Sequence, residues 1–297
     1  MITQANASFV SDETVSVFAF DKFTMASPRM PALFTQQGSN KASENQGSMS
    51  GLGTFQLKTE GVGPELDQPV QQFKKEFLHQ EFALGTVVER KVYDDQNFPF
   101  LQKLGGHIGT SALRTFEQLA AGVFIGAFSS GDYTTEDGAA LCAAHTNKDG
   151  GNSQTNAGTS SFSYDSLGAT MILHRNFTDY RGEDINIEPD LILHPSDIDQ
   201  TVFEAIRSYG DPTEANLKAN YYNGKLSSLS WQYLTNAADW FLIDSMMMKD
   251  NLFWYWKAVL EIFGVGDAWA GLRKIGGYFR SSHSAVDWRW AYGHNVP

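Results

Sequence analysis

The segment from Asp94 to Gly131 constrains the fold of this chain more than any other. Its apolar residues recur in steps of three and four, which places them on one face of a helix: Leu101, Leu104, Ile108, Ala112, Phe116, Leu119, Val123 and Ala127. Pro99 suits a first helical turn, and Gly131 suits a helix end. At roughly 1.5 Å per residue the predicted helix is about 45–50 Å long. The rest of the chain must therefore cover a long apolar stripe.

Glycines within this segment leave its shape open. Gly105, Gly106 and Gly109 lie in its first third, and Gly122 and Gly126 lie in its last. Each costs roughly 1 kcal/mol relative to alanine in a helix interior. One interpretation is a bend or break near Gly105, which gives a short helix followed by a longer one. The other is that Gly122 and Gly126, one turn apart, let another backbone approach closely.

The composition argues against several classes of protein. The formal net charge of −12 over 297 residues argues against a dedicated nucleic-acid binder and against docking on an anionic membrane. The first 20 residues lack the basic residues and continuous apolar run of a secretory signal, and no window is apolar enough to span a membrane. The single cysteine, Cys142, excludes an intrachain disulfide. We expect a soluble, intracellular protein.

Residues 1–50 show weak helical and strand periods, and Ser, Gly, Asn and Gln dominate their second half. Such a segment cannot offset its ordering entropy by itself. It is either a disordered tail or an arm that becomes ordered on another subunit. For the arm, the predicted anchors are Phe18, Phe20 and Phe34.

Residues 51–93 are predicted to form a long two-stranded excursion. Gly53 to Thr59 alternates, with Phe55 and Leu57 on one side, and residues 71–93 are rich in strand formers. A hairpin with so little core needs another surface to lie on. The predicted contacts with another subunit are in its charged stretch, Phe73, Lys74, Lys75, Glu76 and Phe77.

The remainder predicts a mixed α+β fold. Asp137 and Gly138 favour a tight turn, and residues 147–161 a surface loop. A helix is predicted over residues 164–175, capped by Asp165 or Ser166. Strands are predicted at 190–195, 228–233, 239–244, 253–257, 259–265, 275–280 and 286–292.

A second helix is predicted after the strand at 190–195. Ser196 to Asp199 is similar to a capping box and opens it, and Gly210 and Pro212 end it. Its inward residues are predicted to be Ile198, Val202, Ala205, Ile206 and Tyr209.

No constellation of residues indicates catalysis. Residues 264–266 hold only a fragment of a dinucleotide-binding fingerprint. Cys142 lies among alanines, which favours a buried, inert thiol, and the chain offers no paired histidines or second cysteine for zinc. The acidic pairs, Glu136-Asp137 and Glu183-Asp184, are predicted to be solvated turn residues. We expect no enzymatic activity, no cofactor and no metal.

Four segments nevertheless carry a family resemblance. They are Asp137-Gly-Ala-Ala-Leu-Cys-Ala-Ala-His-Thr-Asn147 after the long helix, Glu188-Pro-Asp-Leu-Ile-Leu-His-Pro195, Trp240-Phe-Leu-Ile-Asp244 and Asp287-Trp-Arg-Trp-Ala-Tyr-Gly293. With the order of elements, they resemble the Hong Kong 97 (HK97)-like major capsid fold of tailed phages, and most closely the Mu-like major head subunit family. The resemblance covers roughly residues 70–297.

The resemblance implies an organisation for the whole chain. Residues 1–50 would be an N-terminal arm and 51–93 an extended loop (E-loop) hairpin. The segment 94–131 would be the spine helix of a peripheral domain, 132–256 an axial domain, and 257–297 the last peripheral strands. Arm and hairpin would then reach across neighbouring subunits, where they would gain the core that they lack.

The resemblance also implies a role in the virion. Subunits would assemble in the host cytoplasm into hexamers and pentamers, and then into an icosahedral shell around double-stranded DNA. The partners would be other copies of the chain, a portal, a scaffold and decoration proteins. Some relatives cross-link subunits through a lysine and an asparagine, but Lys58, Lys74, Lys75 and Asn295 cannot be aligned with such a site. No long helical scaffolding segment is visible at the start, so the scaffold would be a separate protein or a segment that precedes this numbering.

Two alternatives remain open on the sequence. An encapsulin-like compartment shares the expected fold and encloses enzymes rather than DNA. A β-rich carbohydrate-binding or glycan-cleaving protein would use late tryptophans as stacking platforms. The inward alternation of Trp231, Trp288 and Trp290 favours core packing over such platforms.

Overall fold

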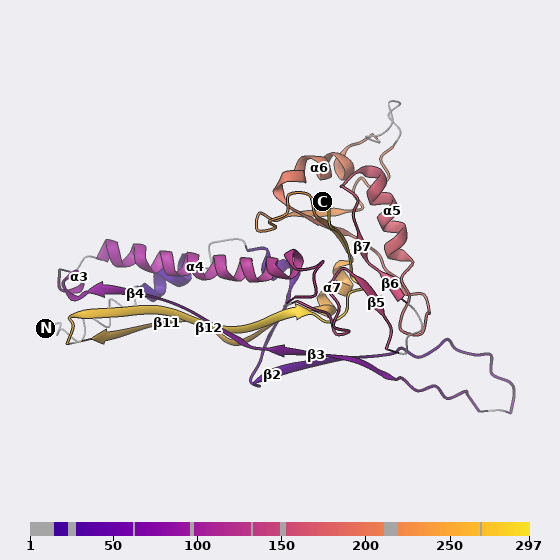
Figure 1. Cartoon of the computed structure of the whole chain (residues 1–297), viewed down its shortest axis with the longest axis horizontal. Helices are drawn as coiled ribbons and strands as arrows, with labels where there is room; N and C mark the ends of the chain where they lie inside the picture. The colour runs from indigo at the N-terminus through magenta and orange to yellow at the C-terminus, as the bar shows by residue number, and fades with distance from the viewer. Residues whose placement is uncertain are drawn as a thin grey trace.

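The computed structural model describes residues 15–22, 28–61, 63–95, 98–131, 133–148, 153–210, 219–267 and 269–297. They form a long body, a lobe at one end of it, and a hairpin that projects past that end (Figure 1). Residues 15–22 are helical. The other elements are α2 (Met30–Leu33), β1 (Thr35–Gly38), β2 (Ser43–Met49), β3 (Gln71–Leu78), β4 (Gln80–Glu89), α3 (Arg90–Asp94), α4 (Phe98–Ile125), β5 (Ala144–Thr146), β6 (Ser153–Thr155), β7 (Ala157–Gly158), α5 (Tyr164–Arg175), β8 (Leu191–His194), η1 (Ser196–Ile198), α6 (Asp199–Arg207), β9 (Ser227–Ser230), β10 (Trp240–Ile243), α7 (Ser245–Asn251), β11 (Leu252–Asp267), β12 (Leu272–Ala285) and β13 (Ala291–His294).

The predicted long helix is α4, and it is continuous over 28 residues. The expected break near Gly105 is therefore wrong. The glycines serve a close approach instead, because a Cβ on Gly105 would lie 2.4 Å from the Val15 carbonyl oxygen and one on Gly109 would lie 2.1 Å from that of Ala19. The helical residues 15–22 thus lie directly on the α4 backbone. The other glycine pair faces a side chain: a Cβ on Gly122 would lie 3.0 Å from the Tyr133 hydroxyl.

A four-stranded sheet of order β1-β11-β12-β4 runs along α4 (Figure 1). Strands β11 and β12 form one long antiparallel hairpin, β4 pairs antiparallel with β12, and β1 pairs parallel with β11. Register shifts between Trp256 and Ala258 and between Ala258 and Glu261 interrupt the alternation of β11, which is why the sequence predicts two strands there. On α4, Phe116 packs edge-on against Phe279, with ring centroids 4.4 Å apart.

The lobe contains a five-stranded sheet of order β7-β13-β10-β8-β9. Every residue of β10 is buried, as its continuous apolar run predicts. Trp240 and Leu242 pack with residues of α5 and α6, whereas Phe241 and Ile243 belong to the core that includes Phe124 of α4. Helix α4 therefore joins the cores of both sheets, as its length predicts.

Residues 28–49 belong to the fold of their own chain. The Met30 N–H donates to Glu117 Oε1 of α4 at 2.9 Å, β1 joins the long sheet, and β2 pairs with β3. Of the predicted N-terminal arm, residues 1–14 and 23–27 lie outside the described residues.

The excursion is built differently from its prediction. Its paired strands are β2 and β3, and β4 belongs to the long sheet. The strand expected from Gly53 to Thr59 is wrong, since the described residues between 50 and 70 contain no strand. The alternating segment 53–59 has no partner strand to pair with, so it is part of an extended loop instead (Figure 1).

Four local predictions also need correction. Helix α5 is capped by Ser163, which forms a capping box with Ser166. Helix α6 has no side-chain cap and follows the single turn η1, and Tyr209 beyond its end is 93% exposed rather than inward. Residues 286–290 turn, and the final strand is β13. The expected loop at 147–161 contains the short strands β6 and β7. No helix of the described chain is long and apolar enough to cross a membrane.

Candidate functional site

The predicted subunit contacts divide by burial. Phe34 and Phe77 are 4% and 2% exposed, because both pack in the core of their own chain. Phe20 is 41% exposed and Phe18 is partly buried on the helix that lies on α4. On β3, Phe73 and Lys75 are partly buried, whereas the remaining two residues are exposed: Lys74 and Glu76.

Alternation along β3 explains this division. Phe77 packs against Tyr255 of β11 with ring centroids 5.1 Å apart. The Lys75 ammonium donates to the carbonyl oxygen and hydroxyl of Thr134, at 2.5 and 3.2 Å, and burial lowers its pKa. One face of β3 is thus fixed to the body. Lys74 and Glu76 on the other face are exposed, and Glu76 Oε1 accepts from the Ser43 hydroxyl of β2 at 2.8 Å.

The described loop between β2 and β3 exposes large apolar side chains. Phe55 and Leu57 are exposed to the full extent of an extended chain, at 106% and 99%, and Leu66 and Leu52 are 89% and 64% exposed. Four large apolar residues within one projecting loop are unusual for a solvent-facing surface. Alternation predicts a strand for Phe55 and Leu57, and neither residue is among the predicted contacts. The sequence feature that could have identified them as contact residues is the apolar alternation of residues 53–59, which has no partner strand.

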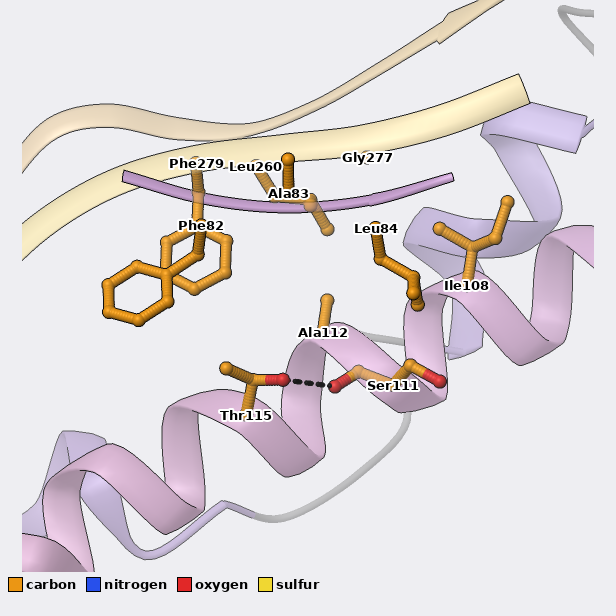
Figure 2. Close-up of a pocket in the computed structure, with 10 residues that line it drawn as sticks. All are labelled: Phe82, Ala83, Leu84, Ile108, Ser111, Ala112, Thr115, Leu260, Gly277 and Phe279. Carbon is orange, nitrogen blue, oxygen red and sulfur yellow. Dashed lines mark hydrogen bonds between the residues drawn. The ribbon is translucent and has the colours of Figure 1, made fainter. Parts of the chain in front are cut away.

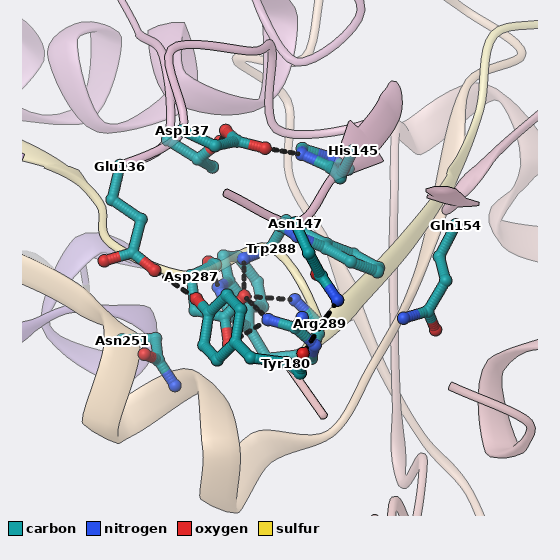
Figure 3. Close-up of polar contacts among 12 residues, drawn as sticks. Glu136, Asp137, His145, Asn147, Gln154, Tyr180, Asn251, Asp287, Trp288 and Arg289 are labelled. Carbon is teal, nitrogen blue, oxygen red and sulfur yellow. Dashed lines mark hydrogen bonds and ion pairs between the residues drawn. The ribbon is translucent and has the colours of Figure 1, made fainter. Parts of the chain in front are cut away.

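A buried polar cluster lies beside Phe73 of β3, and Figure 3 shows its members, which include Glu136, Asp137 and Tyr180. Glu136 is 8% exposed, and so is the Asp137 side chain. The prediction that this acidic pair is solvated is therefore wrong, whereas Glu183 and Asp184 are exposed as predicted. The Tyr180 hydroxyl donates to Glu136, and burial raises the pKa of both groups.

Arg289 is the cation of this cluster. Its guanidinium lies 4.2 Å from the centre of the Tyr180 ring, pairs with Asp287 at 3.0 Å, and donates from Nε to the Thr178 carbonyl at 2.9 Å (Figure 3). Arg289 is only 2% exposed. Asp287 balances the charge of this buried guanidinium, whereas Nη2 of Arg289 has no hydrogen-bond partner among the described residues. The cluster joins the segments that carry Thr178, Tyr180 and Asp287, and it is called the joint below.

The remaining members come from the segment that begins at Asp137. The His145 Nδ1–H donates to Asp137 Oδ2 at 2.7 Å, and the imidazole stacks on Trp288 with centroids 4.4 Å apart. Asn147 Nδ2 donates to the Tyr180 carbonyl at 3.0 Å. Burial acts to raise the pKa of Asp137, but hydrogen bonds from His145 and Thr135 outweigh it and lower the pKa. The described part of the chain holds no cluster of three or more metal-ligating side chains, and Cys142 is buried with its pKa raised.

Two apolar hollows flank α4. One, of about 200 Å³, lies between α4 and the edge strand β4, and Figure 2 shows Phe82 and Leu84 of β4 facing Ala112 across it. The other, of about 560 Å³, lies beside the N-terminal segment and is lined by Phe20, Met30, Phe116 and Trp256 among others. Both are apolar and carry no group suited to catalysis.

Comparison with known proteins identifies the family. A model of the phage capsid protein family matches residues 75–292, which include α4 and most of the long and five-stranded sheets but not β1. The chain therefore belongs to the phage capsid protein family. No curated protein sequence matches it.

Solved structures share the fold at low sequence identity. The mature capsid of bacteriophage PhiM1 matches with a TM-score of 0.59 at 10% identity, covering 92% of this chain and 88% of that chain. The capsid of cyanophage P-SCSP1u matches with a TM-score of 0.58 at 10% identity, covering 89% of this chain and 86% of that chain. The capsid of a native GTA particle matches with a TM-score of 0.57 at 13% identity, covering 88% of this chain and 87% of that chain. The mixed α+β fold is thus that of phage capsid proteins.

The tryptophans bear on the carbohydrate alternative. Trp231, Trp288 and Trp290 are 1%, 4% and 0% exposed, so they form core as predicted and offer no stacking platform. Trp269 is fully exposed at the turn between β11 and β12.

Proposed function

We propose that this chain is a major capsid protein of the HK97-like fold, related to the Mu-like head subunits, and that it is not an enzyme. It assembles into hexamers and pentamers and then into an icosahedral shell around double-stranded phage DNA. Helix α4 is the spine of its peripheral domain, the five-stranded sheet belongs to its axial domain, and β2, β3 and the loop between them are its extended loop. Family membership supports the class of protein.

The observation that carries the mechanism is the exposed apolar loop. Leu52, Phe55, Leu57 and Leu66 are each more than 60% exposed in the single chain. Burying side chains of this size stabilises by about 1.5–3 kcal/mol each, or about 6–12 kcal/mol for four. The loss of translational, rotational and side-chain freedom offsets much of this gain. Each contact is therefore modest, and closed symmetry multiplies it over many subunits.

Further contacts and partners belong to the same proposal. Phe18, Phe20, Phe73, Lys74, Lys75 and Glu76 contribute to subunit interfaces through their accessible faces, and Phe34 and Phe77 support those faces from within. A portal, a scaffold and decoration proteins complete the particle, which assembles in the host cytoplasm. The net charge of −12 suits a container that encloses DNA without binding it tightly.

The test is assembly of the purified chain, followed by negative-stain microscopy and sedimentation velocity, with scaffold added if needed. The variant Phe55→Ser/Leu57→Ser should keep the thermal midpoint of the wild type, because both side chains are exposed, yet lose shells. The matched control is Met246→Ser on α7, which removes another exposed apolar side chain (79%) outside the loop. Shells of normal yield from the double variant would refute the role of the loop.

A further inference from the structure

The loop between β2 and β3 is tied to the body by one carboxylate. Arg181 Nη1 donates to Asp67 Oδ2 at 2.6 Å, and Nη2 donates to Asp67 Oδ1 at 3.1 Å and to the Gln68 carbonyl at 3.0 Å. On the opposite limb of the loop, the Gly53 N–H donates to Asp67 Oδ2 at 2.7 Å. Asp67 therefore links both limbs of the loop to Arg181.

Arg181 itself is presented by a stiff turn. Asp179 Oδ1 accepts from the N–H groups of Arg181 and Glu183, at 2.7 and 2.9 Å, and Gly182 adopts a φ of +84° that favours glycine. Tyr180, inside the same turn, is held by the buried cluster around Arg289. The guanidinium thus projects from a surface that is anchored in the protein interior.

This contact is the outermost of a series along the hairpin. Phe77 packs on Tyr255, Lys75 bonds to Thr134, and Lys148 Nζ donates to the carbonyl of Gln72 at 3.1 Å. The Asp67–Arg181 contact comes next, on the way to the exposed apolar residues of the loop. Among the described residues it is the last of these contacts before the projecting part, so it has more influence on the direction of the loop than the contacts nearer the body.

The contact is better suited to orientation than to stability. The Arg181 and Asp67 side chains are 27% and 41% exposed. Exposed ion pairs contribute little to stability, because solvent screens them. A bidentate guanidinium–carboxylate pair, however, fixes the relative orientation of its two partners.

We propose that Arg181 is a positioning residue that fixes the direction of the β2–β3 loop in the free subunit, through its bidentate contact with Asp67. The consequence rests on the proposed function: a loop already held in one direction loses less conformational entropy when it docks on a second copy.

The first experiment measures the loop direction in the isolated chain. Spin labels at Leu57→Cys and Ile172→Cys, both at exposed positions, report the distance between the projecting loop and α5, and buried Cys142 stays unlabelled. Arg181→Gln should broaden the distance distribution at least twofold. The width for Arg181→Lys should lie between those of the wild type and Arg181→Gln, because an ammonium keeps the charge but cannot form the bidentate pair. A distribution for Arg181→Gln as narrow as that of the wild type would overturn the proposal.

Two controls separate positioning from general loosening. Lys91→Gln removes an exposed ion pair with Glu89, at 3.0 Å, that does not involve the loop, and it should leave the distribution unchanged. The double variant Asp67→Asn/Arg181→Gln should be no broader than either single variant, since both remove one interaction. Additive broadening would show that the two residues act separately, against the proposal. Thermal midpoints should agree across the set.

The second experiment concerns the consequence for assembly. Arg181→Gln should yield fewer shells than the wild type, or shells of more varied diameter. A wild-type chain that forms no shells under any condition would count against the proposed function, whereas the distance distributions in the isolated chain decide the positioning role by themselves.

Discussion

Two glycines of α4, three residues apart, should respond to alanine in opposite directions. A Cβ on Gly109 would lie 2.1 Å from the Ala19 carbonyl oxygen, a backbone atom that cannot rotate away. Among the described residues, a Cβ on Gly106 would meet only the Cγ of the Lys22 side chain, at an ordinary 3.4 Å. Because both positions share one helix, the pair isolates the close approach from helix propensity.

The expected magnitudes follow from burial. Alanine in place of glycine inside a helix stabilises by roughly 1 kcal/mol, which is the full effect expected for Gly106→Ala. Gly109→Ala must displace residues 15–22, where Val15 and Ala19 are both fully buried. Exposing one valine and one alanine side chain costs about 2–4 kcal/mol. After the gain in propensity, Gly109→Ala should lower the free energy of unfolding by about 1–3 kcal/mol.

Urea unfolding followed by circular dichroism measures these free energies. Hydrogen exchange should show faster exchange in residues 15–22 for Gly109→Ala alone. If both variants gain stability equally, the helical segment does not lie on α4 in solution, and the explanation of these glycines fails.

Three further outcomes are expected. Burial lowers the pKa of His174, His283 and His294 to about 4, so the folded state favours their neutral forms. Their stabilisation is complete above the unfolded pKa of about 6.5 and is lost as the pH falls toward 4; urea midpoints that stay constant between pH 7 and 4.5 would contradict this. Cys142 is buried with its pKa raised, so a thiol reagent should label it only after denaturant is added, and rapid labelling of the native chain would show that it is accessible. Glu117 accepts from two N–H groups inside the core, so Glu117→Leu should lower the free energy of unfolding by about 1–3 kcal/mol for each donor left unsatisfied, and an unchanged urea midpoint would refute this.

Periodicity predicted the apolar framework well. The stripe on α4 and the continuous run of β10 both depend on burial at regular spacing, and that spacing is written in the sequence. Periodicity did not decide whether the helix breaks near Gly105 and Gly109. Glycine propensity favours a break, whereas the structure uses the missing Cβ atoms for the contact with residues 15–22, and no local pattern announces such a long-range contact.

The functional surfaces were harder to predict, for two physical reasons. Phe34 and Phe77 were assigned to subunit contacts, yet they fill the core of their own chain, because an aromatic residue in a polar stretch suits either role. Glu136 and Asp137 were assigned to solvent, since adjacent carboxylates usually are solvated. Their burial depends on Tyr180 and His145, and a single sequence cannot show that these partners meet.

The base of the hairpin is specified differently from the rest of the fold. Apolar side chains cover α4, and such packing tolerates small shifts in angle. The joint around Arg289, by contrast, is polar and buried, and the hydrogen bonds that it forms require the chain segments around it to meet in one geometry. Directional contacts are thus concentrated where a small angular error would be magnified along the projecting loop. In the proposed shell, angular accuracy matters most at that point, because the direction of the loop would decide which surface of a neighbour it can reach.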